Sequence, residues 1–162
     1  IASAHIEFEG AYLEDELFLL EYFCHARRLA IVDRPLYNYY WNPSSATHKY
    51  MADYLSTFRR FMERKEALAQ RYGLDVPRWR ENSNWAGLLI AVGNEYAAGN
   101  SASLKEKQRQ VEKIAQLPEM RQAIAAIKPE GMGRNKQIVA ALLRRRWYSL
   151  LTLLYRLKNR GK

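Results

Sequence analysis

Apolar residues recur at helical spacing over most of the sequence after residue 50, and this periodicity constrains the fold more than any other feature. Residues three or four positions apart lie on one face of an α-helix, so a stripe of them predicts an amphipathic helix. The clearest stripe ends before Gly73, which is expected to close the helix. Its members are Met51, Tyr54, Leu55, Phe58, Phe61, Met62, Leu68 and Tyr72.

Four further helices are expected in the rest of the chain, because the same spacing recurs between turn signals. Ser101 precedes one of them, and its hydroxyl can cap that helix. Proline and glycine residues between 129 and 133 separate the last helix from the others. The expected helices are 78–98, a segment after Ser101, 118–128 and 136–158.

β-structure is expected only in the first fifty residues. A helix from Glu14 to Arg28 has acids in its first turn, where they complement the helix dipole. Two short runs rich in aliphatic and aromatic residues follow at 29–33 and 36–41, with Pro35 between them. The expected fold class is therefore mainly α, a helical bundle preceded by a short β-hairpin-like segment.

Glu14 and Asp15 are the first candidates for a functional site. Acids in the first turn of a helix are common, and this structural explanation needs no function. A carboxylate aimed at a cleft can instead act as a general base, which removes a proton from a hydroxyl within hydrogen-bond reach. Composition alone favours the structural explanation, so the catalytic one depends on the neighbouring sequence.

The neighbouring sequence contains a longer pattern between Phe8 and Thr47. It has Phe-Glu-Gly, an acidic pair, P-L-Y-x-Y and S-x-T in this order. The matching residues are Phe8, Glu9, Gly10, Glu14, Asp15, Phe18, Pro35, Leu36, Tyr37, Tyr39, Ser45 and Thr47. The pattern resembles the end of the catalytic domain of family 2 glycosyltransferases, which are inverting enzymes of the GT-A fold. The resemblance covers about a quarter of the chain.

The resemblance implies roles for the acidic pair. Asp15 stands where the family has its catalytic base, which deprotonates the acceptor hydroxyl as that oxygen attacks the anomeric carbon. Glu14 would be a neighbour that shapes the site or contacts the acceptor. Because the other matching positions are in register, the catalytic base is the interpretation that we favour for Asp15.

The resemblance also implies a substrate-binding region after the helix. Tyr37, Tyr39 and Trp41 are expected either in the core of the β segment or along an acceptor sugar, whose apolar face suits an aromatic ring. We favour the core for the two tyrosines. Ser45 and His48 belong to a turn that lies near the bound nucleotide sugar in the family. A lone histidine is more often structural than a ligand, so both interpretations of His48 stay open.

A nucleotide-binding half is missing from this sequence. The family binds its nucleotide diphosphate and divalent metal with an N-terminal βαβ half that ends in D-x-D, and neither that motif nor a Gly-rich phosphate loop occurs here. The chain is therefore expected to be the C-terminal part of a glycosyltransferase of surface polysaccharide or lipopolysaccharide synthesis, inactive alone. In the full-length enzyme we expect Mg²⁺ or Mn²⁺, bound mostly by ligands outside this chain. The expected partners are a nucleotide sugar and a glycan or lipid-linked acceptor.

The positive charge of the chain is concentrated between Arg134 and Lys162. This segment has nine cations and no acid, whereas the other 17 cations match the 17 acids of the chain. It also has an apolar stripe, formed by Val139, Leu143, Trp147, Leu150, Leu154 and Leu157. A basic amphipathic helix of this kind is typical of the membrane interface. Its expected membrane contacts are Arg144, Arg145, Arg146 and Trp147.

Other interpretations of this helix and of the chain stay open. The helix can fold back on the domain with its cations in water. Nucleic acid is a less favoured partner, because the chain shows no recognised nucleic-acid motif. The alternative interpretation of the whole chain is a non-catalytic helical interaction or scaffolding module with a docking tail. The location expected is cytoplasmic, at the inner face of the plasma membrane if the tail binds lipid. The expected parts are the end of the GT-A domain at 1–50, a helical extension at 51–130 and the basic amphipathic helix at 131–162.

Overall fold

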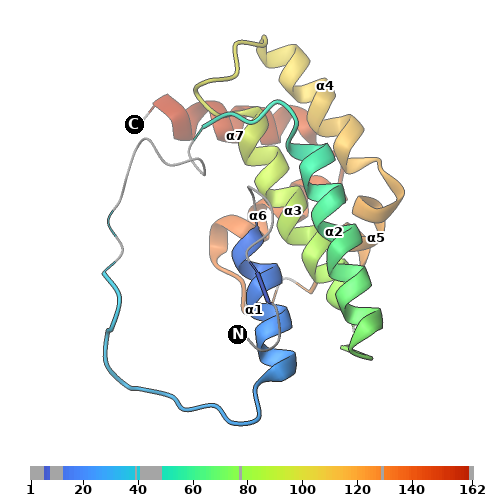
Figure 1. Cartoon of the computed structure of the whole chain (residues 1–162). Coiled ribbons are helices and arrows are strands. Elements are labelled where there is room, and N and C mark those ends of the chain that lie inside the picture. The colour runs from blue at the N-terminus through green and yellow to red at the C-terminus, as the bar shows by residue number, and fades with distance from the viewer. Residues whose placement is uncertain are drawn as a thin grey trace. The chain divides into compact units, whose positions relative to one another are not determined.

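The computed structural model describes residues 6–7, 13–38, 40, 49–76, 78–128 and 130–160 (Figure 1). Within these residues the chain forms seven helices and no strand. The expectation of a mainly helical chain is thereby confirmed. The helices are α1 (Glu14–His25), α2 (Tyr54–Arg71), α3 (Trp79–Glu95), α4 (Leu104–Ala115), α5 (Pro118–Ala126), α6 (Arg134–Arg144) and α7 (Tyr148–Arg160).

The chain divides into two compact units. The N-terminal unit comprises Ile1–Pro43 and Leu55–Val76, and it contains α1 and nearly all of α2. The C-terminal unit comprises Ser44–Tyr54 and Pro77–Lys162, and it contains α3 to α7. The boundaries differ from those of the three expected parts, because α2 groups with α1 and the basic tail groups with the helices before it.

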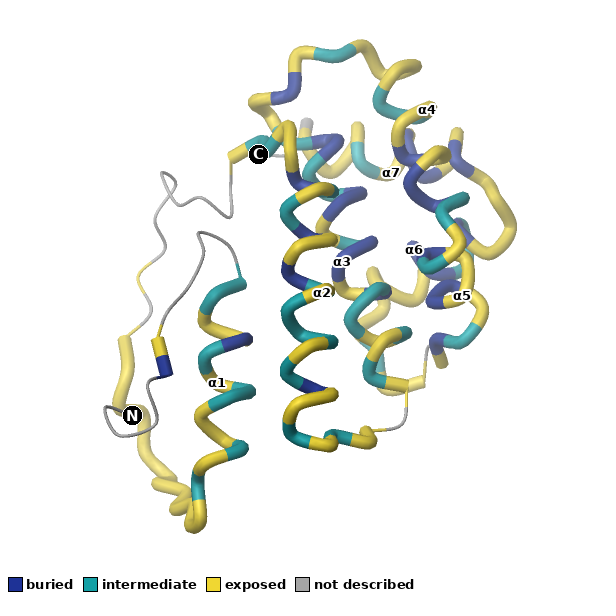
Figure 2. The backbone as a smooth tube through the Cα atoms, turned by 45° about the vertical axis from the view of Figure 1, so that its right-hand side comes forward, coloured by how far each residue is buried: buried dark blue, intermediate teal, exposed yellow. Residues whose placement is uncertain are grey.

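Polar contacts are prominent between the two helices of the N-terminal unit. Helix α1 buries Leu17, and most of its other residues are exposed or half-buried (Figure 2). Lys65 on α2 forms an ion pair with Glu16 on α1. Further along both helices, Arg71 lies 3.3 Å from Glu21 Oε1. Such contacts hold side chains in register but contribute little free energy where water reaches them.

The segment after α1 is extended and exposed to solvent. Residues 27–38 are all exposed, and Ile31 reaches 97%. The strand expected at 29–33 does not form, and the described part of 36–41 shows none either. A strand is stable only when its backbone N–H and C=O groups pair with a neighbour. The segment runs as a single chain in Figure 1, without a second extended segment alongside its described residues.

Helix α3 is central to the C-terminal unit, where it packs against α4 and α5. Its buried residues Trp85, Leu88 and Val92 recur at spacings of three and four, as expected for a core-facing stripe. Helix α7 packs against α4 and α6, and α6 also packs against α5. The other helices complete the core with Val111, Ile114, Met120, Ala123, Leu143 and Leu151.

Helix α4 begins with a capping box. Ser103 Oγ accepts the N–H of Glu106 at 3.3 Å, and the Glu106 carboxylate accepts the N–H of Ser103 at 2.8 Å. The expected cap at Ser101 is therefore wrong by two residues. Ser103 has the acid three positions later that completes the box, and Ser101 does not.

The basic tail forms two helices where the sequence predicted one. Helices α6 and α7 are separated by a turn at 145–147. The N–H of Trp147 donates to Leu142 O at 2.9 Å, and the N–H of Arg146 donates to Leu143 O at 3.1 Å. This pair of bonds is a Schellman motif, with Arg146 at the left-handed position (φ 56°) where glycine is usual. The apolar stripe continues through the turn, so its periodicity did not reveal the break.

Candidate functional site

The acidic pair lies at the start of α1, where the sequence predicted a helix to begin. Asp15 is exposed and Glu14 is half-buried. Asp15 Oδ1 accepts the N–H of Glu16 at 2.9 Å, which satisfies one of the amide hydrogens that a helix leaves unpaired at its start. The preceding residue, Leu13, provides no side-chain cap. Asp15 therefore helps to start the helix and at the same time presents a carboxylate to solvent.

Of the expected substrate-binding residues, the structure describes Tyr37. Its side chain lies in the extended segment and is 81% exposed, so the expectation of a core position for this ring is wrong. Tyr39, Trp41, Ser45 and His48 lie outside the described residues. A sugar contact by any of these side chains stays a prediction.

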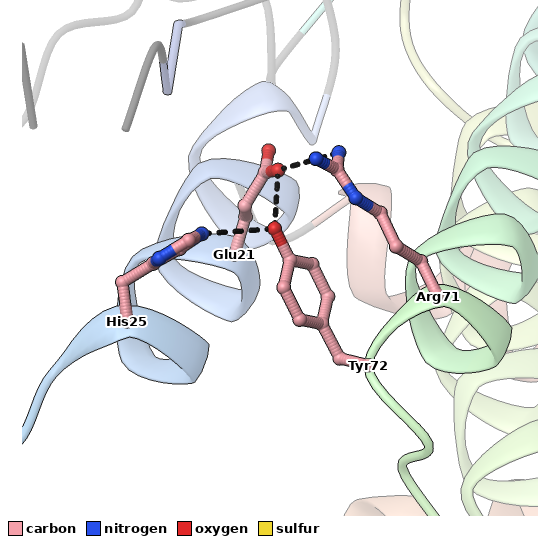
Figure 3. A network of polar contacts seen from close by, with 4 residues as sticks. All are labelled: Glu21, His25, Arg71 and Tyr72. Atoms are coloured by element: carbon pink, nitrogen blue, oxygen red, sulfur yellow. Dashed lines mark hydrogen bonds and ion pairs between the residues drawn. The ribbon is translucent and has the colours of Figure 1, made fainter. Parts of the chain in front are cut away.

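A polar network joins the C-terminal ends of α1 and α2 (Figure 3). The hydroxyl of Tyr72 donates to Glu21 Oε1 at 2.9 Å, and Arg71 Nη1 donates to the same oxygen at 3.3 Å. His25 Nε2 lies 2.9 Å from the Tyr72 hydroxyl oxygen. Since the single hydroxyl hydrogen is given to Glu21, His25 must donate through Nε2. The rings of His25 and Tyr72 also meet edge to face, with centroids 5.4 Å apart.

The network keeps the Tyr72 hydroxyl protonated. Partial burial raises the pKa of Tyr72, and its hydrogen bond to Glu21 raises that pKa further, while Arg71 opposes both effects. Burial also raises the pKa of the nearby Cys24 thiol, and the charge of Glu21 acts in the same direction. The raised pKa values favour the neutral form of both groups at physiological pH.

A cleft of about 320 Å³ adjoins the network within the N-terminal unit. Leu17, Phe18 and Leu68 supply apolar lining. The charged lining residues are Glu7, Glu21, Arg64 and Arg71. Because two acids face two arginines, the cleft suits a polar neutral ligand such as a sugar better than a strongly charged one.

Sequence reasoning missed this network and assigned no role to His25. The two hydrogen bonds of the Tyr72 hydroxyl join residues that are 47 and 51 positions apart in the sequence, so no local pattern predicts them. The local signal is the spacing of Glu21 and His25, which places them one turn apart on the same face of α1.

The arginines expected at the membrane have different surroundings in the C-terminal unit. Arg144 donates Nε to Ile124 O at 3.0 Å and Nη2 to Ile127 O, so it caps the C-terminal end of α5. Arg145 stacks on the half-exposed ring of Trp147, with 5.2 Å between its Cζ and the ring centroid. All four expected membrane contacts, Arg144, Arg145, Arg146 and Trp147, are exposed. Of the two arginines described above, Arg144 is the one whose guanidinium donates to backbone carbonyls of the fold.

Helix α7 has two apolar faces. Tyr148, Leu151 and Thr152 are buried on the face that packs against α4 and α6. Four large apolar side chains on the other side are exposed, at the spacing of one helical face: Leu150, Leu153, Leu154 and Leu157. Arg156 and Lys158 are exposed beside them. An apolar face bordered by cations is the pattern of a helix that docks on an anionic apolar surface.

The described residues offer neither a metal-binding cluster nor a membrane-spanning helix. They contain no group of three or more His, Cys, Asp or Glu that could hold a metal ion. None of the helices in this part of the chain combines the length and apolar character needed to cross a bilayer.

Comparisons with known proteins add no relative. The chain matches no protein-family model, and neither curated proteins nor solved structures give a significant match.

Proposed function

We propose that this chain is the C-terminal part of an inverting glycosyltransferase that transfers a sugar from a nucleotide diphosphate to a hydroxyl acceptor in surface polysaccharide or lipopolysaccharide synthesis. The observation that carries this proposal is the exposed carboxylate of Asp15 in the first turn of α1, at the position of the catalytic base in the family pattern. The cleft that begins one turn further along α1 supports it, since its lining suits a neutral polar acceptor.

In this proposal Asp15 takes the proton of the acceptor hydroxyl. The acceptor oxygen forms a bond to the anomeric carbon from one side while the bond from that carbon to the diphosphate breaks on the other side. The nucleotide diphosphate leaves with the bonding electron pair, and the anomeric configuration is inverted. In this proposal the ligands of the divalent metal lie mostly outside this chain, and no step is assigned to the metal here.

The remainder of the catalytic domain would also cover the extended segment after α1. Leu29, Ile31 and Val32 are exposed large apolar residues in that segment. In a complete GT-A domain they would pair as the β-hairpin expected from the sequence and become buried. Exposed apolar residues in an extended segment support the proposal that another part of the protein covers them. Without such a cover, a segment of this kind promotes aggregation.

The test replaces Asp15 with asparagine in the full-length protein. We expect Asp15→Asn to abolish sugar transfer without a change in melting temperature, because the amide keeps a hydrogen-bond acceptor for Glu16 N–H but cannot take a proton at neutral pH. Asp33→Asn is the matched control, since it makes the same change on an exposed acid of the extended segment. Normal turnover of Asp15→Asn would remove Asp15 as the base, and the helical interaction module would then be the better proposal.

We also propose that the outer face of α7 docks on an anionic membrane surface. Its four exposed leucines supply apolar contact, and the absence of acids between Arg134 and Lys162 in the sequence supplies charge complementarity. Each well-placed cation adds about 1 kcal/mol of attraction to anionic lipid. In this proposal the protein acts at the inner face of the plasma membrane, where lipid-linked acceptors would be available.

Flotation with vesicles tests this docking. Leu157→Glu should abolish binding to vesicles rich in phosphatidylglycerol, since it places a charge on the outer face of α7. Leu36→Glu is the control, because it makes the same change at an exposed leucine outside α7. If both variants float as well as the original chain, the outer face is not a membrane contact. If Leu157→Glu instead converts a dimer into a monomer, the occupant of the face is a second copy of the chain.

A further inference from the structure

A shallow pocket of about 240 Å³ lies in the C-terminal unit, where the ends of α4 and α6 meet α5 and the start of α7. Its polar lining comes from Gln116, Arg121, Arg144, Arg146 and Tyr148. Alanines and the apolar side chains of Ile124 and Leu143 form the rest. The polar residues come from separate helices and from the turn after α6, so the pocket exists only in the folded unit.

Three guanidinium groups line this pocket, and no carboxylate is among its described lining residues. Arg144 is bound to two backbone carbonyls, which fix its position but leave its charge uncompensated. The helix ends that meet here have dipoles of both signs, since α4 and α6 end at the pocket and α7 begins there. Helix dipoles amount to about half a charge each, so the three full charges decide the sign of the pocket.

Tyr148 adds a hydrogen-bond donor. The hydroxyl oxygen accepts a hydrogen bond from Gln116 Nε2 at 2.9 Å. A hydroxyl that accepts this bond keeps its own hydrogen for a further acceptor. Tyr148 is buried, so its position is fixed by packing at the first residue of α7. The pocket therefore combines three cations with an oriented neutral donor.

The left-handed backbone of Arg146 favours a ligand-binding role for its side chain. It adopts a left-handed conformation (φ 56°) at the position of the Schellman turn where glycine is preferred. A side chain at this position carries a conformational cost that glycine avoids. Residues held in such conformations are concentrated at functional sites. The turn also brings Arg146 to the pocket beside Arg144, with which it shares the lining.

We propose that this pocket binds the phosphoryl group of a phosphate monoester. A tetrahedral dianion can accept hydrogen bonds from several planar guanidinium groups at once, and the Tyr148 hydroxyl can donate to a further oxygen. The apolar part of the lining leaves room for the group that carries the phosphate. This site is independent of the proposed sugar transfer, because none of its residues belongs to the N-terminal unit.

Titration calorimetry of the whole chain with phenyl phosphate at low salt tests the proposal. We expect Arg146→Gly to weaken binding by about tenfold, the usual effect of losing one charge-assisted hydrogen bond. Glycine relieves the left-handed backbone, so this variant should be at least as thermostable as the original chain. Arg145→Gln is the matched control, since it removes the neighbouring charge outside the pocket and should change affinity less than about twofold.

Vesicles distinguish a lipid headgroup from a soluble ester. Phosphatidic acid carries a phosphate monoester, and phosphatidylglycerol carries a diester. If the original chain prefers phosphatidic acid over phosphatidylglycerol at equal surface charge, and Arg146→Gly loses the preference, the occupant is a lipid headgroup. If phenyl phosphate binds but the vesicles are not distinguished, the occupant is a soluble ester. The proposal is overturned if neither arm shows binding, or if Arg145→Gln weakens binding as much as Arg146→Gly does.

Discussion

Helices α1 and α3 are held within their units by different kinds of interaction. Among its residues, α1 buries Leu17, and it forms ion pairs and hydrogen bonds with α2 and the following Tyr72. Helix α3 buries Trp85, Leu88 and Val92 against other helices of its own unit. Exposed ion pairs contribute about 0–1 kcal/mol each, whereas a buried large apolar side chain contributes about 1.5–3 kcal/mol.

The difference indicates which unit can be stable without further protein. The C-terminal unit has a core that every one of its helices enters. The N-terminal unit instead presents an extended segment with exposed Ile31 and Tyr37. We therefore expect the C-terminal unit to be the more stable of the two, and in the proposed transferase the rest of the catalytic domain would cover the exposed residues of the N-terminal unit.

The largest expected effect on stability is in the core of the C-terminal unit. Leu88 is fully buried on α3, so Leu88→Ala should lower the free energy of unfolding by about 2–5 kcal/mol. The control is Leu19→Ala on α1, where the side chain is 47% exposed and the change should stay within about 0.5 kcal/mol. Denaturant titration followed by tryptophan fluorescence measures both. Equal losses would show that the two helices are held by similar packing.

A smaller effect is expected at the start of α4. Ser103→Ala removes both capping hydrogen bonds of the side chain and should cost about 1 kcal/mol. Ser101→Ala is the control, because Ser101 precedes the helix without being its cap. If Ser101→Ala costs as much as Ser103→Ala, the helix begins earlier than the structure shows.

The same capping box has a defined pH dependence. Hydrogen bonds from the Ser103 side chain and backbone hold the pKa of Glu106 below its ordinary value. The ionised carboxylate therefore stabilises the folded chain above the ordinary carboxyl pKa, and this contribution is lost as the pH falls through the lowered pKa. Glu106→Gln keeps an acceptor for the Ser103 N–H but cannot titrate, so its stability should depend less on pH in the acid range. An unchanged acid profile would contradict the box.

The polar network of the N-terminal unit should give a still smaller and more local effect. Tyr72→Phe removes the hydroxyl shared by Glu21 and His25, but water can replace it because the network is partly exposed. We expect faster amide hydrogen exchange in α1, with little change in the global unfolding free energy. Tyr40→Phe in the exposed segment is the control and should leave exchange in α1 unchanged.

The sequence-based predictions were most accurate where residues close together in the sequence determine the structure. Helix α3 was predictable because Trp85, Leu88 and Val92 repeat within a few residues. The break between α6 and α7 could not be predicted, because the residue in the left-handed conformation is Arg146. A glycine at this position would have indicated the end of a helix. The start of α1 at Glu14 was predictable from its acids, but the network around Tyr72 joins residues far apart in the chain. The same holds for the arginine-lined pocket of the C-terminal unit, which combines Arg121 with Arg146.

The smallest expected effect on this chain is also the sharpest test of the comparison between its two units. Ile31 is 97% exposed, so Ile31→Lys should change the unfolding free energy by no more than about 0.5 kcal/mol. In the full-length protein the result should differ. If 29–33 is a strand covered by the rest of a catalytic domain, a lysine there must be buried without a partner and should be strongly destabilising.

Ile31→Val is the control for both proteins, because it keeps an apolar β-branched side chain and should be tolerated in each. The measurement is the denaturation midpoint of the chain and of the full-length protein with each variant. A loss that occurs with Ile31→Lys in the full-length protein alone would mean that the N-terminal unit is completed by its missing neighbour. Equal tolerance in both proteins would make the segment a solvent-exposed linker, and the exposed apolar residues would no longer support a missing half of the domain.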